Sequence, residues 1–171
     1  QTRAKRRDEP AEELRDLTGQ LDGVQAKLRV FRAMERDFES YQKSVRLVMQ
    51  EAQRGGLRNI HGPLSRLIKA DDEYTVAIEI ALGAAMQNIV VATEQDAKAG
   101  IAYLKRTGGG RATFLPVSAI TGKNLSETGL GRCRGYVGIA SELVEYDDQY
   151  RGIVENLLGR TVICENIDCA I

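Results

Sequence analysis

The sequence predicts an α+β fold in which an internally duplicated α/β domain follows a long coiled-coil helix. Three observations lead to this prediction. The first 54 residues carry a heptad pattern, glycines and short β-like runs become frequent from residue 55 onward, and one segment of this second region occurs twice. We therefore divide the chain into an arm, residues 1–54, and a globular domain, residues 55–171.

The arm is predicted from apolar residues that recur in steps of three and four, with one extra three-residue step near Phe31. The seam consists of Leu14, Leu17, Leu21, Val24, Leu28, Phe31, Met34, Phe38, Tyr41, Val45 and Val48. Roughly forty helical residues extend about 60 Å, which exceeds the span of a compact domain of the remaining size. Such a narrow seam needs a partner helix, either from another chain or from sequence outside these residues. The alternative is an amphipathic helix that packs on its own domain.

The duplication is visible in the segment DDEYTVAIEIALG, residues 71–83, which returns as DDQYRGIVENLLG, residues 147–159. With Gly62 placed over Gly138, the two copies align without a gap through these segments. A slip of four residues then aligns Val90, Val91 and Asp96 with Val162, Ile163 and Asp168. So long an ordered match indicates two copies of one supersecondary unit.

The two copies divide the globular domain into a first half at about residues 57–116, linking loops at 117–136 and a second half at 137–171. The second half stops where its last helix should begin. We therefore expect the remainder of that half in a longer parent protein.

Each copy is expected to run strand, helix, strand, helix, with its first strand at residues 64–68 or 140–144. The two aspartates before each first helix are interpreted as N-caps that also complement the helix dipole. Gly83 and Gly159 are expected in the left-handed conformation that ends many helices.

Further elements are expected after these glycines. Short strands are predicted at residues 88–92, 112–116 and 160–164. Between the first two of these, Thr93 and Asp96 predict a capping box for a helix that runs to about Arg106.

Catalytic chemistry is not predicted. The pairs Asp71-Asp72 and Asp147-Asp148 could be catalytic or metal-binding carboxylates, but adjacent side chains on a turn diverge and no histidine stands close in sequence. Capping explains both pairs at once. No catalytic residue, metal or cofactor is therefore predicted for this chain, and we do not expect it to be an enzyme.

The cysteines and the single histidine fit structural roles. Cys133, Cys164 and Cys169 are odd in number and lack CxxC spacing, which favours a reducing cytoplasm. Metal ligation by the last two is the alternative to small buried residues. His61 precedes Gly62 and is interpreted as a turn or junction residue.

The run RTGGGRATFLP carries three glycines, Gly108, Gly109 and Gly110, which resemble a phosphate loop. They follow a predicted helix and precede a strand, whereas a phosphate loop needs the opposite order. We interpret them as a helix-to-strand turn, or as a surface for close backbone approach, and group them with Gly83 and Gly159 as candidates for dimer contact or close packing.

Basic residues are concentrated between residues 105 and 134, where Glu127 is the one acid. The six bases are Lys105, Arg106, Arg111, Lys123, Arg132 and Arg134. Such a region can bind the phosphates of DNA without reading bases, and the alternative is an ordinary solvated basic loop.

The combination of an arm with the motifs IHGPLSRLI, YTVAIEIALGAAMQNIVV, GIAYLKRTGGGRATFLP, GIASELV and NLLGRTVI closely resembles the hinge of bacterial-type structural maintenance of chromosomes (SMC) proteins. The resemblance covers residues 55–171, with the arm before them.

The resemblance implies a cytoplasmic, nucleoid-associated parent that organises and segregates chromosomes. The parent would be an ATPase of the ABC type, with its ATP-binding heads absent here. It further implies a hinge homodimer, weak and salt-dependent DNA contact, a returning coiled-coil helix as partner of the arm, and no membrane association. The alternatives are a purely structural coiled-coil scaffold without nucleic-acid contact and, less supported by the residues, a small-molecule-binding domain.

Overall fold

The computed structural model describes residues 2–36, 38 and 40–170, and the side chains of residues 12–33, 38 and 40–170. Two compact units are present, residues 1–40 and residues 41–171, and each is described by itself. Within the described residues, no helix is both long and apolar enough to cross a membrane.

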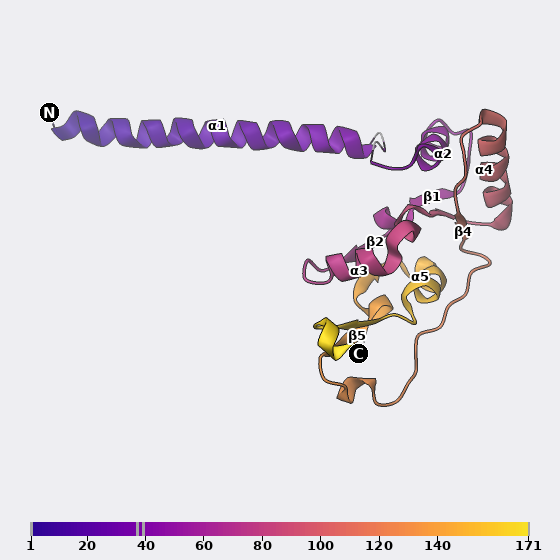
Figure 1. Ribbon diagram of the computed structural model, residues 1–171. Helices are drawn as coiled ribbons and strands as arrows, with labels where there is room; N and C mark the ends of the chain where they lie inside the picture. The colour runs from indigo at the N-terminus through magenta and orange to yellow at the C-terminus, as the bar shows by residue number, and fades with distance from the viewer. Residues whose placement is uncertain (1, 37, 39, 171) are drawn as a thin grey trace. The chain divides into compact units, whose positions relative to one another are not determined.

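The first unit is built on one long helix, α1 (Thr2–Arg36), visible in Figure 1. Six side chains of the predicted seam are exposed along it, namely Leu14, Leu17, Leu21, Val24, Leu28 and Phe31. The side chain of Met34 lies outside the described part of the chain. Phe38 follows the helix with a positive φ of 55° and is buried.

The rest of the predicted arm differs from a continuous helix. Residues 43–53 form a separate helix, α2 (Lys43–Gln53), whose Val45 and Val48 are buried in the second unit. Tyr41 joins that unit as well, because its hydroxyl lies 2.8 Å from Oγ of Ser65. Steps of three and four also describe an amphipathic helix on a globular domain, so the pattern could not separate the two.

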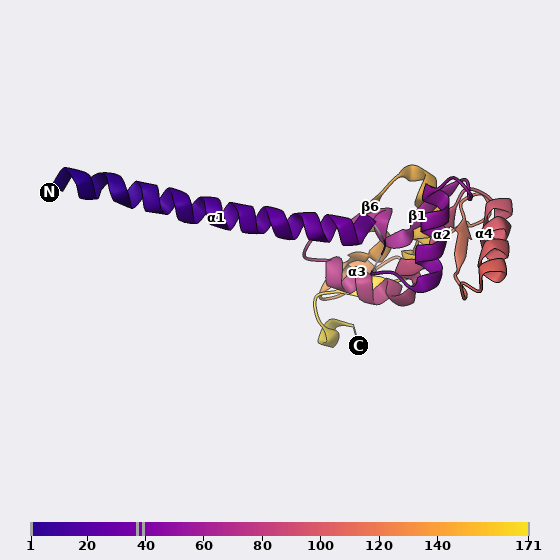
Figure 2. The ribbon, with the colours of Figure 1, turned by 90° about the horizontal axis from the view of Figure 1, so that it is seen from above.

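The second unit begins its first copy after α2. The copy comprises β1 (Ile60–Pro63), the 3-10 turn η1 (Leu64–Arg66), β2 (Ile68–Ala70), α3 (Thr75–Leu82), the 3-10 turn η2 (Gly83–Gln87) and β3 (Ile89–Val91). It continues into α4 (Glu94–Thr107) and β4 (Phe114–Pro116). β3 lies between an antiparallel β1 and a parallel β4. α2 packs against α4, and Figure 2 shows these helices side by side at one end of the unit.

The second copy follows a linking segment, residues 117–135, which contains the 3-10 turn η3 (Leu130–Arg132). Its elements are β5 (Tyr136–Ile139), η4 (Ala140–Glu142), β6 (Val144–Tyr146), η5 (Asp148–Tyr150), α5 (Arg151–Leu158), β7 (Val162–Cys164) and η6 (Ile167–Cys169). β5 pairs with β7 in antiparallel orientation, as β1 pairs with β3. The order of elements confirms the predicted duplication.

The predicted first strands are misplaced. Leu64–Arg66 and Ala140–Glu142 are 3-10 turns, and each has a strand on either side. The apolar residues of LSRLI recur at steps of three and four, which suits a helical turn better than a strand. The strands predicted at 88–92, 112–116 and 160–164 are confirmed as the shorter β3, β4 and β7.

The slip between the copies is three residues, not four. Ile60 pairs with Val91 before a bulge, and Tyr136 pairs with Cys164 before an equivalent bulge. The first strands are therefore offset by 76 residues and the second strands by 73. Two adjacent aliphatic residues could be aligned in either frame from sequence, whereas strand pairing admits one register.

The two copies meet through equivalent strands. β2 pairs with β6 in antiparallel orientation, and the central pair, Lys69 with Glu145, consists of residues that are themselves 76 positions apart. A local pseudo-two-fold axis therefore passes through this pair. α3 also contacts α5 across the same axis.

One hydrophobic core serves both copies. It includes Leu64, Ile78 and Leu82 from the first copy together with Ile153 and Leu158 from the second. The two copies consequently fold as one body rather than as two independent domains.

Candidate nucleic-acid and self-association interface

The six predicted DNA-contact residues are all exposed, and none of them forms an ion pair among the described residues. They do not form one surface. Lys105 and Arg106 occupy the last turn of α4, and Lys105 shares a pocket of about 500 Å³ with Arg111. Arg106 also lies over the ring of Tyr103, with its guanidinium carbon 5.7 Å from the ring centre.

The other three bases are distant from this group. Figure 1 places α4 at the top of the second unit and the orange segment around η3 at its bottom. Arg132 belongs to η3, and Arg134 lines a pocket together with Asp168. Lys123 lines a third pocket together with Arg160.

Arg160 was missed by reasoning from sequence. It stands 37 residues from Lys123 in the chain, outside the basic region, and becomes its neighbour only when the linking segment crosses the end of α5. The available signal was its position directly after Gly159, the residue against which this segment packs.

The three adjacent glycines end α4. Gly108 adopts the left-handed conformation, with φ 62° and ψ 29°, and caps the helix through Leu104 O. A Cβ at Gly109 would lie 2.7 Å from a methyl carbon of Leu104 and 2.9 Å from one of Leu47, so a larger residue there would require these leucine side chains to move. Gly110 also has a positive φ, of 89°. All three glycines are thus explained by the local fold, and their part in dimer contact stays a prediction.

Gly83 and Gly159 end their helices in different ways. Gly83 has φ 48° and ψ −123°, and nothing lies within 4 Å of a Cβ built on it. Gly159 has φ −65°, so the predicted left-handed conformation is wrong there. A Cβ on Gly159 would lie 2.6 Å from Lys123 O, so the close approach of the linking segment requires this glycine.

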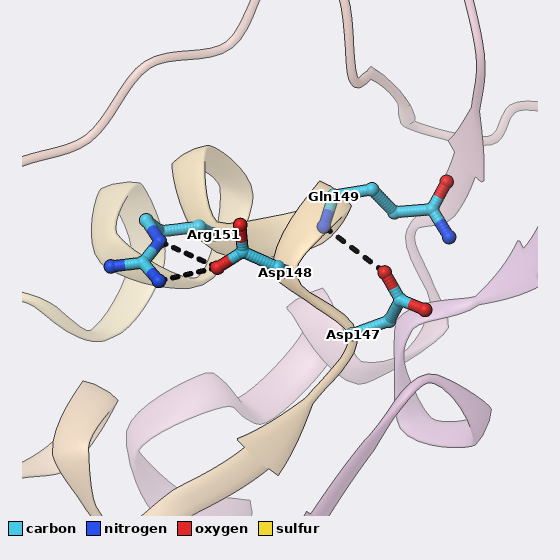
Figure 3. Close-up of polar contacts among 4 residues, drawn as sticks. All are labelled: Asp147, Asp148, Gln149 and Arg151. Atoms are coloured by element: carbon cyan, nitrogen blue, oxygen red, sulfur yellow. Dashed lines mark hydrogen bonds and ion pairs between the residues drawn. The ribbon is translucent and has the colours of Figure 1, made fainter.

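The acid pairs also differ between the copies. Asp147 accepts a hydrogen bond from Gln149 N at 3.1 Å and caps η5, while Arg151 pairs with Asp148 through its Nε at 3.0 Å (Figure 3). This hydrogen bond, followed by the charge of Asp148, raises the pKa of Arg151.

In the first copy, no side chain caps α3, which begins at Thr75. Asp71 accepts instead through its main-chain carbonyl, from Thr75 N at 3.0 Å. In the second copy Asp147 caps only the 3-10 turn η5 that leads into α5, and no side chain caps α5 itself. The capping prediction is therefore confirmed for Asp147 alone and wrong for the first copy. Among the described residues, no group of three or more histidine, cysteine or acidic side chains could hold a metal ion.

His61 lies within β1 rather than in a turn. Its Nδ1 is 2.8 Å from the hydroxyl of Tyr150, and the two rings meet edge to face. Burial, followed by the charge of Asp147, raises the pKa of Tyr150. The pair joins the first copy to the second inside the unit, which no local sequence signal indicates.

A duplicated α+β domain with an antiparallel strand pair on its internal pseudo-two-fold axis thus defines the class of this protein. The family model described as the SMC proteins flexible hinge domain matches residues 57–171. The chain belongs to this family.

Several similar proteins are chromosome partition proteins of bacteria. The chain is 36% identical to the chromosome partition protein Smc of Lactiplantibacillus plantarum over 99% of its own length and 14% of that protein. It is 40% identical to the Smc protein of Bacillus subtilis over 84% of its length and 12% of that protein. A crystal structure of an asymmetric dimer of the Geobacillus stearothermophilus SMC hinge domain superposes with a TM-score of 0.82 and 41% identity, covering 87% of this chain and 60% of that one.

Proposed function

We propose that this domain is the dimerisation hinge of a chromosome-organising SMC ATPase of bacteria, active at the nucleoid in the cytoplasm. The ATP-binding heads of such a protein would lie outside the 171 residues. The exposed seam of α1, from Leu14 to Phe31, would pack against the returning coiled-coil helix of the same protein. We retain the domain limits 1–54 and 55–171 as functional limits, although the compact unit starts at Tyr41.

The internal pseudo-two-fold axis supports self-association most directly. Two similar halves in one chain can meet the two halves of a second chain in a closed, symmetric arrangement. The solved Geobacillus stearothermophilus hinge, which is 41% identical, is described as an asymmetric dimer, so it supports self-association but not the symmetry of the arrangement.

Sedimentation equilibrium tests the self-association. We expect a mass of twice that of one chain at high micromolar concentration, for a protein extended beyond residue 171 so that the second half is complete. A single-chain mass across the whole concentration range would contradict the proposed dimer.

We further propose weak, sequence-independent DNA contact, centred on Lys105, Arg106 and Arg111. Two of these bases share one pocket, and the third stands beside them in the last turn of α4. Phosphate contacts release counterions, so the affinity should fall steeply as salt rises.

A salt-titrated gel shift tests this contact. Replacing the three bases by alanine should reduce the slope of log affinity against log salt by roughly 2 to 3, because each phosphate contact contributes about 0.9. The matched control removes three exposed bases elsewhere in the unit, Arg54, Arg58 and Lys98. An equal loss in the control would mean that the protein has no localised DNA site.

The alternative function is a structural scaffold without nucleic-acid contact. The dispersion of the predicted bases over three places favours it. Absence of a shifted band at low salt, in a protein that still dimerises, would establish this alternative.

A further inference from the structure

The helix α3 exposes an aliphatic face. Val76 is 66% exposed and Ile80 is 77% exposed, although they stand one turn apart on a helix that packs its other side into the core. The space above Gly83, one turn further on, is open. A helix that is apolar on both sides is typical of one that is covered on both sides.

The second copy shows what covers the equivalent face. At the offset of 76 residues, the counterparts of Val76, Ile80 and Gly83 are Gly152, Asn156 and Gly159 on α5. Residues 120–125 of the linking segment lie against these three residues, and Gly159 is buried there, although Asn156 stays exposed. Figure 1 shows this segment passing α5 on the side away from α3.

The cover is held by specific contacts. Asn156 Nδ2 donates to Thr121 O at 3.0 Å, and Leu125 N donates to Gly159 O at 2.7 Å. A Cβ on Gly152 would collide with Ile120 O, so the main chain of the segment lies directly on the helix. This face of α5 is therefore a specific binding surface for an extended segment of polypeptide.

We propose that Val76, Ile80 and Gly83 form a docking face for another extended segment, laid across α3 as residues 120–125 are laid across α5. The inference rests on the proposal that the chain is the hinge of a longer SMC protein. The pseudo-two-fold axis that exchanges β2 with β6 also exchanges α3 with α5, so it carries the face of α5 that residues 120–125 contact onto the exposed face of α3.

The residue types of the docking face on α3 indicate what kind of segment can bind there. Val76 and Ile80 offer no hydrogen-bonding group where Asn156 offers an amide, and their side chains keep a passing main chain further from the helix than Gly152 does. The occupant must present aliphatic side chains to this pair. Its main chain can approach the helix closely only at Gly83, where the space is open.

The pseudo-two-fold axis also indicates which part of the protein would occupy the docking face. The polypeptide that follows β3, α4 and β4 of the first copy covers the helix of the second copy. The polypeptide that follows β7 in the second copy is thereby assigned to the helix of the first. Among the residues that the structure describes, none occupies this place, so the segment belongs to the longer protein.

Cysteine labelling tests the proposal. Ile80→Cys is introduced into the 171-residue chain and into the full-length protein, with Cys133, Cys164 and Cys169 changed to serine, and its reaction with a maleimide is timed. We expect labelling at least ten times slower in the full-length protein, at a rate independent of protein concentration. Lys98→Cys, an exposed position on α4, is the matched control and should react equally in both proteins.

Equal labelling of residue 80 in the two proteins would overturn the proposal. Protection that grows with protein concentration would also overturn it, because the occupant would then be a second copy. Hydroxyl-radical footprinting of Val76 and Ile80 in the unmodified proteins gives the same comparison if the serine variants do not fold. The dimer measurement is independent, so an unprotected Ile80 in a protein that dimerises leaves the hinge function intact.

Discussion

The two copies share a fold but differ in what covers their helices. In the second copy, residues 120–125 lie against one side of α5, whereas the first copy leaves Val76 and Ile80 of α3 in solvent. The residue types follow this difference, since glycine and asparagine admit a main chain that valine and isoleucine would displace. The two copies therefore contribute equivalent helices to one shared core, and they differ on the outer faces of those helices.

The largest effect should come from the shared core. Leu158→Ala and its counterpart Leu82→Ala remove buried leucines from the two ends of one cluster. We expect each to lower the free energy of unfolding by about 3 kcal/mol in urea denaturation. We also expect a single transition in both variants, because the two copies share their core.

A second transition in either variant would show that the copies unfold separately. Ile80→Ala, on the exposed face of the 171-residue chain, is the control and should change the unfolding free energy by less than about 0.5 kcal/mol.

The helix-ending glycines should respond differently. Gly159→Ala forces the linking segment away from α5 and should cost about 2 kcal/mol. Gly83→Ala has free space but a positive φ, and should cost about 1 kcal/mol. Only the first should accelerate tryptic cleavage after Lys123, which mass spectrometry of the digest would detect. Equal cleavage in both variants would contradict the role given to Gly159.

The caps that follow the second strands should differ less. Thr93 accepts from Asp96 N at 3.3 Å, and its counterpart Asn166 accepts from Cys169 N at 3.1 Å. Thr93→Ala should cost about 1 kcal/mol because it opens a capping box on the fourteen-residue α4. Asn166→Ala should cost only a few tenths of that, because η6 is a single turn, and thermal unfolding would rank the two. The reverse ranking would place the more important cap in the second copy.

The smallest effect should be a pH dependence confined to the first copy. The hydroxyl of Thr93 donates to Asp96, and this bond lowers the pKa of the Asp96 carboxyl from its ordinary value. Burial opposes the shift, and the hydrogen bond from Asn59 Nδ2 at 3.0 Å adds to it. A depressed pKa adds stability that is complete above the unfolded value and is lost as the pH falls through the folded value.

Unfolding measured from about pH 5 to pH 2 should therefore show a steeper loss in the natural protein than in Asp96→Asn. The counterpart in the second copy, Cys169, carries no carboxyl group, so Cys169→Ser should leave the slope unchanged. If the loss of stability with falling pH were equally steep in Asp96→Asn, Asp96 would make no contribution to stability in acid.

The duplication, the capping box at Thr93 and the approximate places of α1, α3, α4 and α5 could be predicted from the amino-acid sequence. These features depend on local patterns, namely helical spacing, side chains that cap helices and short aliphatic strands. They can therefore be predicted without knowing which distant residues pack against them. The sequence pattern could not distinguish a coiled-coil seam from a helix packed on the domain at Val45 and Val48, because both have apolar residues at steps of three and four.

The three-residue slip, the strand pair on the pseudo-two-fold axis and the position of Lys123 beside Arg160 were established by the three-dimensional structure. It also separated six bases that are close in sequence into three places on the unit. Strand register and the path of a linking segment depend on contacts between residues far apart in the chain. A short stretch of sequence does not indicate which distant residues it will contact.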